Sequence, residues 1–468
     1  MKTFDYIIVG TGQATGTLVG KLLTTGKSIA IIEGNKIGGS CVNYGCTPTK
    51  TMVAAVKAIH MAKSGAFYGF SAGDVKTDFS RVRERMNEIR NGNRDAFTKW
   101  LESREQITLF YEWAYFTGEK TIKVGSQEIK GETIFINTGT HPFIPPIEGI
   151  SQVNALDSAG LLDLDTLPEH LLILGGGYIG VEFAQIFNRL GSKVTVVQGA
   201  GQLMPREDKD VADSIFKFLK EEGIGFMLNS KAIQVTEENN EIHLVISQNG
   251  KEKTIKGSHF LVATGRRPNT PKLNLEATGI AINKHGYIEV DDYCHTNVKG
   301  IFAVGDVNGQ GAFTHTAVND AEVVLEYLFG NKSRSIFKRN MAYALFTDPP
   351  LGRVGMSEKE AFDSGKKVLK ATYPMSRINR AREMGETKGF AKLLVDAETD
   401  LILGATILGV GGDEIINMFA TIMHSNIPCK EYRKVMLVHP TISELMPYVL
   451  DGIAEVKNKN ELKNENSN

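Results

Sequence analysis

Cysteine and tryptophan are scarce in this chain of 468 residues, which has four cysteines and two tryptophans. Four cysteines are too few for a disulfide-stapled secreted scaffold, so a close pair favours redox chemistry or metal binding. Acidic and basic residues nearly cancel to a formal net charge of -1, which argues against nucleic acid or an anionic membrane as the main partner.

Long apolar runs are also missing, since none reaches the roughly 18 residues that a membrane span needs. The N-terminal stretch MKTFDYIIVGTG is too short in its apolar part for a signal peptide, lacks a basic segment of any length, and leads into a glycine-rich turn. We therefore expect a cytoplasmic protein with no membrane partner. At roughly 100–200 residues per domain, its length predicts about three domains.

The clearest pattern that is present is a repeated βαβ unit. Residues 5–33 and 171–198 each read as a buried strand, a glycine-rich turn, an amphipathic helix and a second strand. Gly10 precedes Glu33 by 23 positions, and Gly175 precedes Gln198 by the same number. One such motif is weak evidence for a dinucleotide site, whereas two copies in matched register are strong. The sequence thus predicts two Rossmann-like dinucleotide-binding domains in an α/β fold.

The first turn departs from the full glycine motif at one position. Gly10 and Gly12 allow backbone N–H groups to approach a pyrophosphate, but Thr15 stands where a third glycine usually packs helix against strand. We expect a slight outward displacement of the helix with the phosphate contact retained. Glu33, at the end of the second strand, can accept hydrogen bonds from ribose hydroxyls. Alternatively, Glu33 is an ordinary surface acid at the end of a strand.

Two later segments also echo each other. INTGTHPFIP (136–145) and LVATGRRPNT (261–270) are apolar strands followed by Thr-Gly and a proline-bearing turn, and we interpret them as points where the chain passes between domains. The boundaries predicted for the first nucleotide domain are 1–145 and 265–335. The second nucleotide domain is predicted to span residues 146–264, and an α+β C-terminal domain is predicted to span residues 336–455. The polar residues 456–468 are expected to form a disordered tail.

The stretch GGSCVNYGCTPTK (38–50) places two of the four cysteines five positions apart. On a regular helix that spacing gives a rise of ~7.5 Å and different faces, whereas a disulfide needs Cα atoms within ~6.8 Å. Cys41 and Cys46 therefore cannot share an undistorted helix. Gly45 can supply irregular backbone, and Pro48 suits the first turn of a following helix. Cys46 would then lie near a helix N-terminus, where the dipole favours a thiolate.

Two alternatives to a redox pair remain open from the residues alone. A zinc site needs two more ligands at suitable spacing, and Cys294 and Cys429 are isolated and distant in sequence. Two inert buried thiols are the other alternative. No metal site is predicted.

Six motifs occur in a characteristic order: GxG near the N-terminus, C-x4-C with CTPTK, GGGYIGVE, ATGRRPN, FAVGD and HPTISE. Together they closely resemble the class I pyridine nucleotide–disulfide oxidoreductases, the flavoprotein family of dihydrolipoamide dehydrogenase, glutathione reductase and mercuric reductase. The resemblance covers nearly the whole chain. It implies an FAD domain, an NAD(P) domain and a C-terminal dimerisation domain in a homodimer. The implied activity is electron transfer between NAD(P)H and a dithiol or disulfide substrate, as in dihydrolipoamide dehydrogenase.

The resemblance also assigns residues. Cys46 is the thiol beside the flavin and Cys41 the interchange thiol that meets substrate. Lys50 lies near the flavin and pairs with Glu182. His439, held by Glu444, is a general acid or base supplied by the other subunit. The implied FAD contacts are Gly10, Gly12, Glu33, Lys50, Thr138, Gly139 and Asp306, and the implied NAD(P) contacts are Gly175, Gly177, Tyr178, Gly180, Gln198 and Gly265.

Within the NAD(P) set, Tyr178 resembles the aromatic residue that covers the flavin until nicotinamide displaces it. Gln198 can bond a 2′-hydroxyl but cannot neutralise a 2′-phosphate, and Gly199 stands where NADP-specific relatives carry arginine. This favours NADH, although Arg206 lies near enough in sequence to reach a phosphate.

The substrate is left open. Tyr44 and Thr47 replace residues that are usually aliphatic in dihydrolipoamide dehydrogenases and glutathione reductases. A mercuric-reductase-like reductase of metal ions or electrophiles is the first alternative, although His439 and Glu444 are normally missing from mercuric reductases. A flavin-bearing redox sensor or complex subunit with little turnover is the second.

Overall fold

The computed structural model describes residues 1–455, and the tail expected at 456–468 lies outside them. Its first sheet has the strand order β3-β2-β1-β6-β5-β4, with β17 also paired to β6. The strands are β1 (Lys2–Val9), β2 (Ile29–Ile32), β3 (Ile107–Phe110), β4 (Ala114–Gly118), β5 (Thr121–Val124), β6 (Gln127–Ile136) and β17 (Ile301–Ala303). Because β17 joins this sheet in parallel with β6, a late segment of the chain belongs to the first domain.

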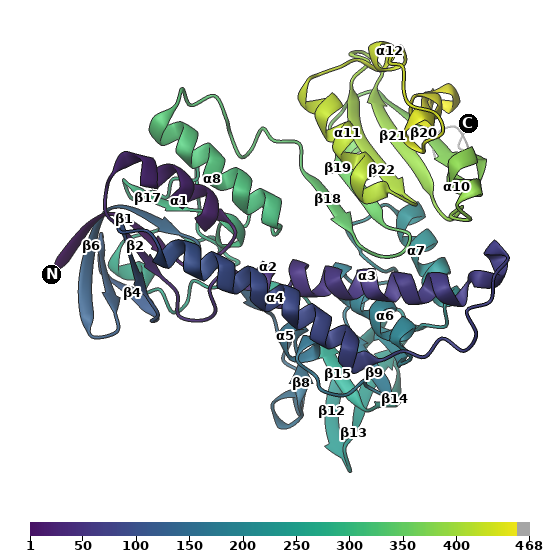
Figure 1. Cartoon of the computed structure of the whole chain (residues 1–468), viewed down its shortest axis with the longest axis horizontal. Helices are drawn as coiled ribbons and strands as arrows, with labels where there is room; N and C mark the ends of the chain where they lie inside the picture. The colour runs from purple at the N-terminus through teal and green to yellow at the C-terminus, as the bar shows by residue number, and fades with distance from the viewer. Residues whose placement is uncertain (456–468) are drawn as a thin grey trace.

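The central strands β1 and β6 of this sheet end in buried apolar residues. Ile7, Ile8 and Val9 of β1 are all buried, as expected for parallel strands that helices cover on both faces. Two of these helices are α1 (Ala14–Leu22) and α8 (Thr314–Phe329), which lie side by side (Figure 1).

The second sheet is parallel and has the order β11-β10-β9-β15-β8. Its strands are β8 (Ala155–Leu156), β9 (His170–Leu174), β10 (Lys193–Val197), β11 (Gly225–Met227) and β15 (His259–Val262). An antiparallel sheet of β12 (Ser230–Glu238), β13 (Glu241–Gln248) and β14 (Lys251–Gly257) packs beside it. The prediction of two Rossmann-like units in an α/β fold is thus confirmed.

The two segments interpreted as domain crossings pair with each other. β7 (Thr140–Pro142) and β16 (Arg266–Pro268) form a two-stranded antiparallel ladder. The chain therefore leaves the first domain and returns to it through one shared connection.

The C-terminal part is an antiparallel sheet in the order β18-β19-β22-β21-β20-β23, with α11 (Gly412–His424) packed on it. The strands are β18 (Ala342–Leu345), β19 (Leu351–Gly355), β20 (Val368–Pro374), β21 (Phe390–Asp396), β22 (Ile402–Leu408) and β23 (Ala454–Glu455). This matches the α+β domain that the sequence predicts.

Helices of the first domain pack on the second domain. α3 (Cys46–Lys63) runs along α4 (Phe79–Glu102) and packs on α6 (Tyr178–Leu190) of the second domain (Figure 1). α4 carries charged residues on its outer face and packs mainly on α3 and α2 rather than flat on the sheet. Within residues 1–455, no helix is long and apolar enough to span a membrane.

Candidate active site

Cys41 and Cys46 lie on two consecutive helices that Gly45 separates. α2 (Gly39–Tyr44) carries Cys41, and Cys46 is the first residue of α3. Gly45 has φ −130° and ψ −115°, far from helical values, and a Cβ there would stand 3.1 Å from the carbonyl oxygen of Ser40. The break brings the two sulfurs to one hydroxyl: Thr314 Oγ1 lies 2.9 Å from Cys41 Sγ and 3.5 Å from Cys46 Sγ.

The two thiols, both unoxidised in this structure, differ in acidity. The hydrogen bond from Cys41 lowers the pKa of Cys46 to about 6, and the Thr314 hydroxyl and the Lys50 charge act in the same direction against the effect of burial. The same bond to Cys46, together with burial, raises the pKa of Cys41. At neutral pH the dithiol therefore consists of a Cys46 thiolate and a Cys41 thiol, and the thiolate is the reactive form of a cysteine.

Lys50 and Glu182 form an ion pair one turn further along α3. Lys50 Nζ lies 2.9 Å and 2.7 Å from the two carboxylate oxygens of Glu182, which is only 6% exposed. The backbone N–H of Phe346 also donates to Glu182, at 2.9 Å. A buried carboxylate needs such partners, and these tie α3, α6 and the segment after β18 together beside the cysteines.

The first glycine-rich turn forms a close-fitting cradle. Gly10 has φ +96°, and a Cβ on it would stand 2.4 Å from the carbonyl oxygen of Asn137. Glu33 Oε2 accepts hydrogen bonds from the backbone N–H and the hydroxyl of Thr11, at 2.9 Å and 2.6 Å. The carboxylate thus lies directly beside the turn, at the end of β2. Gly12 also faces Asn137, whose side chain a Cβ would approach to 3.0 Å.

Thr15 is wholly buried in this turn, and its hydroxyl finds two partners. It donates to the carbonyl oxygen of Gly10 at 3.1 Å and accepts from Asn137 Nδ2 at 2.9 Å. These bonds show how the position usually held by a third glycine accommodates a β-branched residue.

The second turn has the same form with all three glycines. A Cβ on Gly175 would stand 2.4 Å from the carbonyl oxygen of Ala263, and one on Gly180 would stand 2.0 Å from that of Gly175. Gly177 and Gly265 face open space. Gln198 is buried at the end of β10, where its Oε1 accepts from the backbone N–H of Gly176 at 3.1 Å.

Asp306 bonds to the ladder between the domains through Thr140, which directly follows the Thr138–Gly139 segment. Thr140 donates its hydroxyl hydrogen to Asp306 Oδ2 at 2.8 Å. Burial raises the pKa of Asp306, against the hydrogen bond from Thr140 and the charge of Arg266. Gly139 has a left-handed backbone, with φ +64°.

His439 and Glu444 lie apart from the cysteines, in the C-terminal domain. His439 Nδ1 is 2.9 Å from both oxygens of Glu444, so Nδ1–H donates to the carboxylate and Nε2 is left for other chemistry. The imidazole is 73% exposed. Within residues 1–455 no hydrogen bond or ion pair joins His439 to Cys41 or Cys46.

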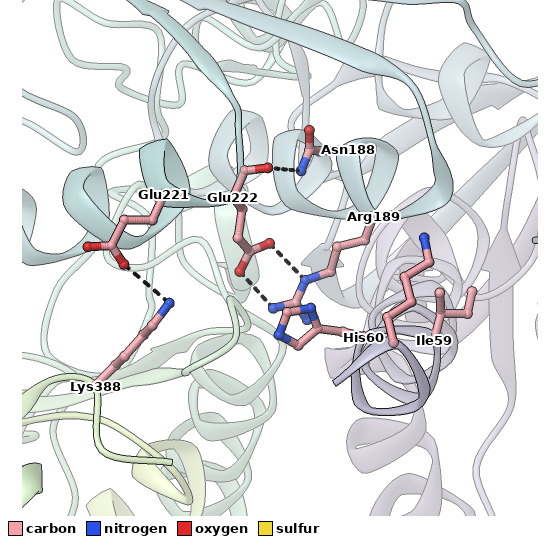
Figure 2. Close-up of a pocket in the computed structure, with 8 residues that line it drawn as sticks. Ile59, His60, Asn188, Arg189, Glu221, Glu222 and Lys388 are labelled. Carbon is pink, nitrogen blue, oxygen red and sulfur yellow. Dashed lines mark hydrogen bonds and ion pairs between the residues drawn. The ribbon is translucent and has the colours of Figure 1, made fainter. Parts of the chain in front are cut away.

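The polar pocket in Figure 2 lies at the far end of α3 and α6 from the cysteines. Four of the charged side chains that line it form two ion pairs, Arg189 with Glu222 and Lys388 with Glu221 (Figure 2). None of the site residues predicted from the sequence lines this pocket, so it is not part of the candidate active site.

Sequence reasoning missed Thr314, the hydroxyl that both sulfurs share. It is the first residue of α8 and lies more than 260 positions from either cysteine in the sequence. The only available signal was its place shortly after the FAVGD motif.

Comparisons with known proteins agree with this geometry. Residues 4–321 match the family model described as pyridine nucleotide-disulphide oxidoreductase, and residues 341–449 match the dimerisation domain of that family. The chain belongs to the pyridine nucleotide-disulphide oxidoreductase family. Its members use FAD and NAD(P)H, so the chain is an FAD-dependent NAD(P)H–disulfide oxidoreductase. The presence of the dimerisation domain supports a homodimer.

Individual relatives match over almost the full length of the chain. The probable pyridine nucleotide-disulfide oxidoreductase RclA of Escherichia coli (strain K12) is 38% identical, over 95% of this chain and 98% of that protein. A dihydrolipoyl dehydrogenase of Geobacillus stearothermophilus is 31% identical, over 94% of each. Among solved structures, the Cu(II) complex of the HOCl-induced flavoprotein disulfide reductase RclA from Escherichia coli has a TM-score of 0.87 and 36% identity. That match covers 96% of this chain and 99% of the other.

The two glycine-rich turns fit the cofactors of the family. Each leaves no room for a Cβ at its first glycine, which lets the backbone approach a pyrophosphate. Each is followed by a polar side chain at the end of the second strand, Glu33 in the first domain and Gln198 in the second. The donor set therefore suits one dinucleotide in each domain.

Proposed function

We propose that this enzyme uses Cys41 and Cys46 as a redox pair that takes electrons from NADH and reduces a disulfide substrate. The observation that carries the proposal is the break at Gly45, which presents both sulfurs to the Thr314 hydroxyl and makes Cys46 the more acidic thiol.

FAD, when bound, accepts a hydride from the nicotinamide and hands on two electrons. Gly10, Gly12, Glu33 and Asp306, together with the Thr138–Gly139 segment, would hold it. Lys50 would lie near it, with its charge held in place by Glu182. Two electrons and one proton open the Cys41–Cys46 bond and leave a Cys46 thiolate and a Cys41 thiol.

Reduction of the substrate then requires a base. Because the pKa of Cys41 is raised, its thiol does not ionise unaided near neutral pH. A histidine oriented by a carboxylate can remove that proton, which is the role proposed for His439 with Glu444. The Cys41 thiolate attacks one substrate sulfur, and the departing thiolate takes the proton from His439. Cys46 then attacks Cys41, which re-forms the pair and releases the second substrate sulfur as a thiolate, and this thiolate takes a proton from solvent.

In a homodimer, His439 would act on the cysteines of the other subunit. Mixing subunits tests this directly, since a heterodimer of Cys41→Ser and His439→Ala chains has one site with both lesions and one with neither. We expect such heterodimers to recover about half of the wild-type activity per dimer while each parent homodimer is inactive. Heterodimers as inactive as the parents would contradict a shared site.

The nicotinamide partner is proposed to be NADH, at a site formed by Gly175, Gly177, Gly180 and Gly265. Gln198 offers an amide rather than a cation at the ribose position, and its amide is already bonded to the turn through Gly176. Tyr178, the first residue of α6, is proposed to cover the nicotinamide site until the coenzyme binds. We also propose a cytoplasmic location, because a reversible thiol pair suits a reducing compartment.

A second candidate function is the reduction of Cu(II). The Escherichia coli RclA structure that this chain resembles is a Cu(II) complex, and neighbouring thiol and thiolate groups are soft ligands that suit copper, above all Cu(I). Oxidation of the Cys46 thiolate and the Cys41 thiol to a disulfide releases one proton and two electrons, which reduce two Cu(II) ions to Cu(I).

Steady-state assays separate these candidates. NADH and NADPH are each offered with lipoamide, glutathione disulfide, Cu(II) or Hg(II). Disulfide-dependent oxidation of NADH that Cys41→Ser abolishes supports the first function, and oxidation that only a metal ion elicits supports the second. Full disulfide turnover by Cys41→Ser would refute the role of Cys41, and no turnover with any acceptor would favour a redox sensor.

A further inference from the structure

Glu207 is a fully buried carboxylate on which two domains converge, and neither glycine motif includes it. It lies on the segment after β10, and the same segment bonds to the second glycine-rich turn, because the N–H of Met204 donates to the carbonyl oxygen of Gly176 at 2.8 Å. Glu207 Oε2 accepts from Arg353 Nη1 of β19 at 2.6 Å. A buried charge of this kind is stable only with partners of good geometry.

The other carboxylate oxygen is shared by two tyrosines. Tyr178 donates its hydroxyl hydrogen to Glu207 Oε1, and Tyr343 of β18 donates to the same oxygen at 2.6 Å. The two rings lie 5.6 Å apart between centroids. Burial and the Glu207 charge raise the pKa of both tyrosines, so both remain donors over the working range of pH. We call Tyr178, Glu207, Tyr343 and Arg353 the Glu207 cluster.

Arg353 and its surroundings hold the carboxylate in place. Arg353 Nη2 also bonds Asp208 at 3.2 Å, and Asp208 accepts from the buried Lys392 at 2.9 Å. Because Arg353 and Lys392 lie in the C-terminal domain, that domain fixes the acceptor to which Tyr178 is bonded.

The cluster also extends towards the redox pair. The ring of Tyr343 stacks on Phe313 with centroids 5.5 Å apart and planes 4° apart. Phe313 directly precedes Thr314, whose hydroxyl bonds Cys41. A continuous set of contacts therefore joins the first residue of α6 to the cysteines through a strand of the C-terminal domain.

We propose that Glu207 is a positioning residue that holds Tyr178 over the nicotinamide site, and that Tyr343 weakens this hold by sharing the same oxygen. This rests on the proposed function, in which Tyr178 must move for the coenzyme to bind. Moving the ring breaks a hydrogen bond to a charged acceptor. The affinity for the coenzyme is therefore reduced by the fraction of molecules in which Tyr178 remains bonded.

The proposal makes predictions of opposite sign for two tyrosine variants. Tyr178→Phe removes the hydroxyl, and Glu207→Gln removes the charge that accepts from it, so both should bind NAD⁺ about three- to tenfold more tightly. Tyr343→Phe leaves Tyr178 as the only phenol on Oε1, which should strengthen that bond and weaken NAD⁺ binding by about two- to threefold. A general loosening of the fold cannot produce opposite effects from the two changes.

Isothermal titration of the oxidised, FAD-loaded enzyme with NAD⁺ measures these affinities without turnover. Glu222→Gln is the matched control, since Glu222 is also a carboxylate that accepts from an arginine, Arg189 (Figure 2), but its side chain is 11% exposed and lies in the polar pocket. We expect this control to lower the melting temperature and leave the NAD⁺ dissociation constant unchanged.

The outcomes are distinct. Tighter binding by Tyr178→Phe with weaker binding by Tyr343→Phe supports the proposal, and it does so even if Glu207→Gln fails to fold. Unchanged affinity in both tyrosine variants, or a change of the same sign in both, overturns it. If that outcome occurs while NADH still opens the cysteine pair of the wild-type enzyme, the proposed role of Glu207 is wrong and the proposed function stands. A wild-type enzyme that binds neither NAD⁺ nor NADH would overturn the proposed function as well.

Discussion

Replacing Thr314 with valine isolates the one hydroxyl that both sulfurs share. Valine keeps the shape of threonine but cannot donate to Cys41 Sγ at 2.9 Å or bond Cys46 Sγ at 3.5 Å. A hydrogen bond to a charged group contributes about 1.5–3 kcal/mol, and one pKa unit corresponds to about 1.36 kcal/mol. Because the hydroxyl divides between two sulfurs, the lower end applies, and we expect the pKa of Cys46 to rise by about one unit.

The sign of the pH dependence follows from the thiolate. Cys46 has a pKa lowered to about 6, so its reactivity with an alkylating agent should rise with pH and reach half its maximum near that value. At pH 6.5 the thiolate fraction should fall from about three-quarters in the wild type to about one-quarter in Thr314→Val.

Iodoacetamide labelling of the reduced protein across a pH series, with the adduct at Cys46 identified by peptide mass spectrometry, measures this midpoint. Thr314→Ser keeps a hydroxyl and should keep the wild-type midpoint. Cys41→Ala removes the hydrogen bond with the largest effect on Cys46 and should shift the midpoint further than Thr314→Val. An unchanged midpoint in Thr314→Val would refute the assignment of this hydroxyl.

Three further changes probe other parts of the site. Lys50→Met leaves the Glu182 carboxylate buried without its cation, so urea denaturation should show a loss of about 3–5 kcal/mol in the free energy of unfolding. Adding Glu182→Leu to Lys50→Met removes the unpaired charge and should largely restore the free energy of unfolding. His439→Ala should slow disulfide turnover by about 100-fold or more, while rapid-quench alkylation shows NADH opening the cysteine pair at the wild-type rate. Gly10→Ala places a Cβ 2.4 Å from the carbonyl oxygen of Asn137, so the absorbance spectrum of the purified protein should show less FAD per chain than the wild type. A full complement of FAD in this variant would contradict the proposal that the first glycine-rich turn holds FAD.

Features that depend on neighbouring residues could be read from the sequence. A strand, a glycine-rich turn and a helix form a local unit, so both dinucleotide folds were predictable. The geometry around Cys41 and Cys46 was predictable for the same reason, because a five-residue spacing on a regular helix keeps the sulfurs apart. Gly45 was the one residue between them that could break the helix.

Features that depend on distant segments could not be read in the same way. The hydroxyl of Thr15 bonds Asn137, which lies 122 positions further along the chain, so a displaced helix was expected where the fold instead supplies a partner. Thr314 and Glu207 stand outside every motif. Thr314 lies more than 260 positions from the cysteines it bonds, and Glu207 bonds Tyr343 and Arg353 of another domain. Burial and side-chain direction in the assembled fold decide their roles, and neither follows from spacing along one segment.

The central claim is that the bond between Cys41 and Cys46 opens when the enzyme receives electrons from NADH. Differential alkylation under denaturing conditions, with mass spectrometry of the cysteine peptides, tests it in oxidised enzyme before and after anaerobic NADH. The account predicts that Cys294 and Cys429 are labelled in both samples, and that Cys41 and Cys46 are labelled only after NADH. Cysteines 41 and 46 that label equally before and after reduction, or that stay bonded in excess NADH, would contradict it.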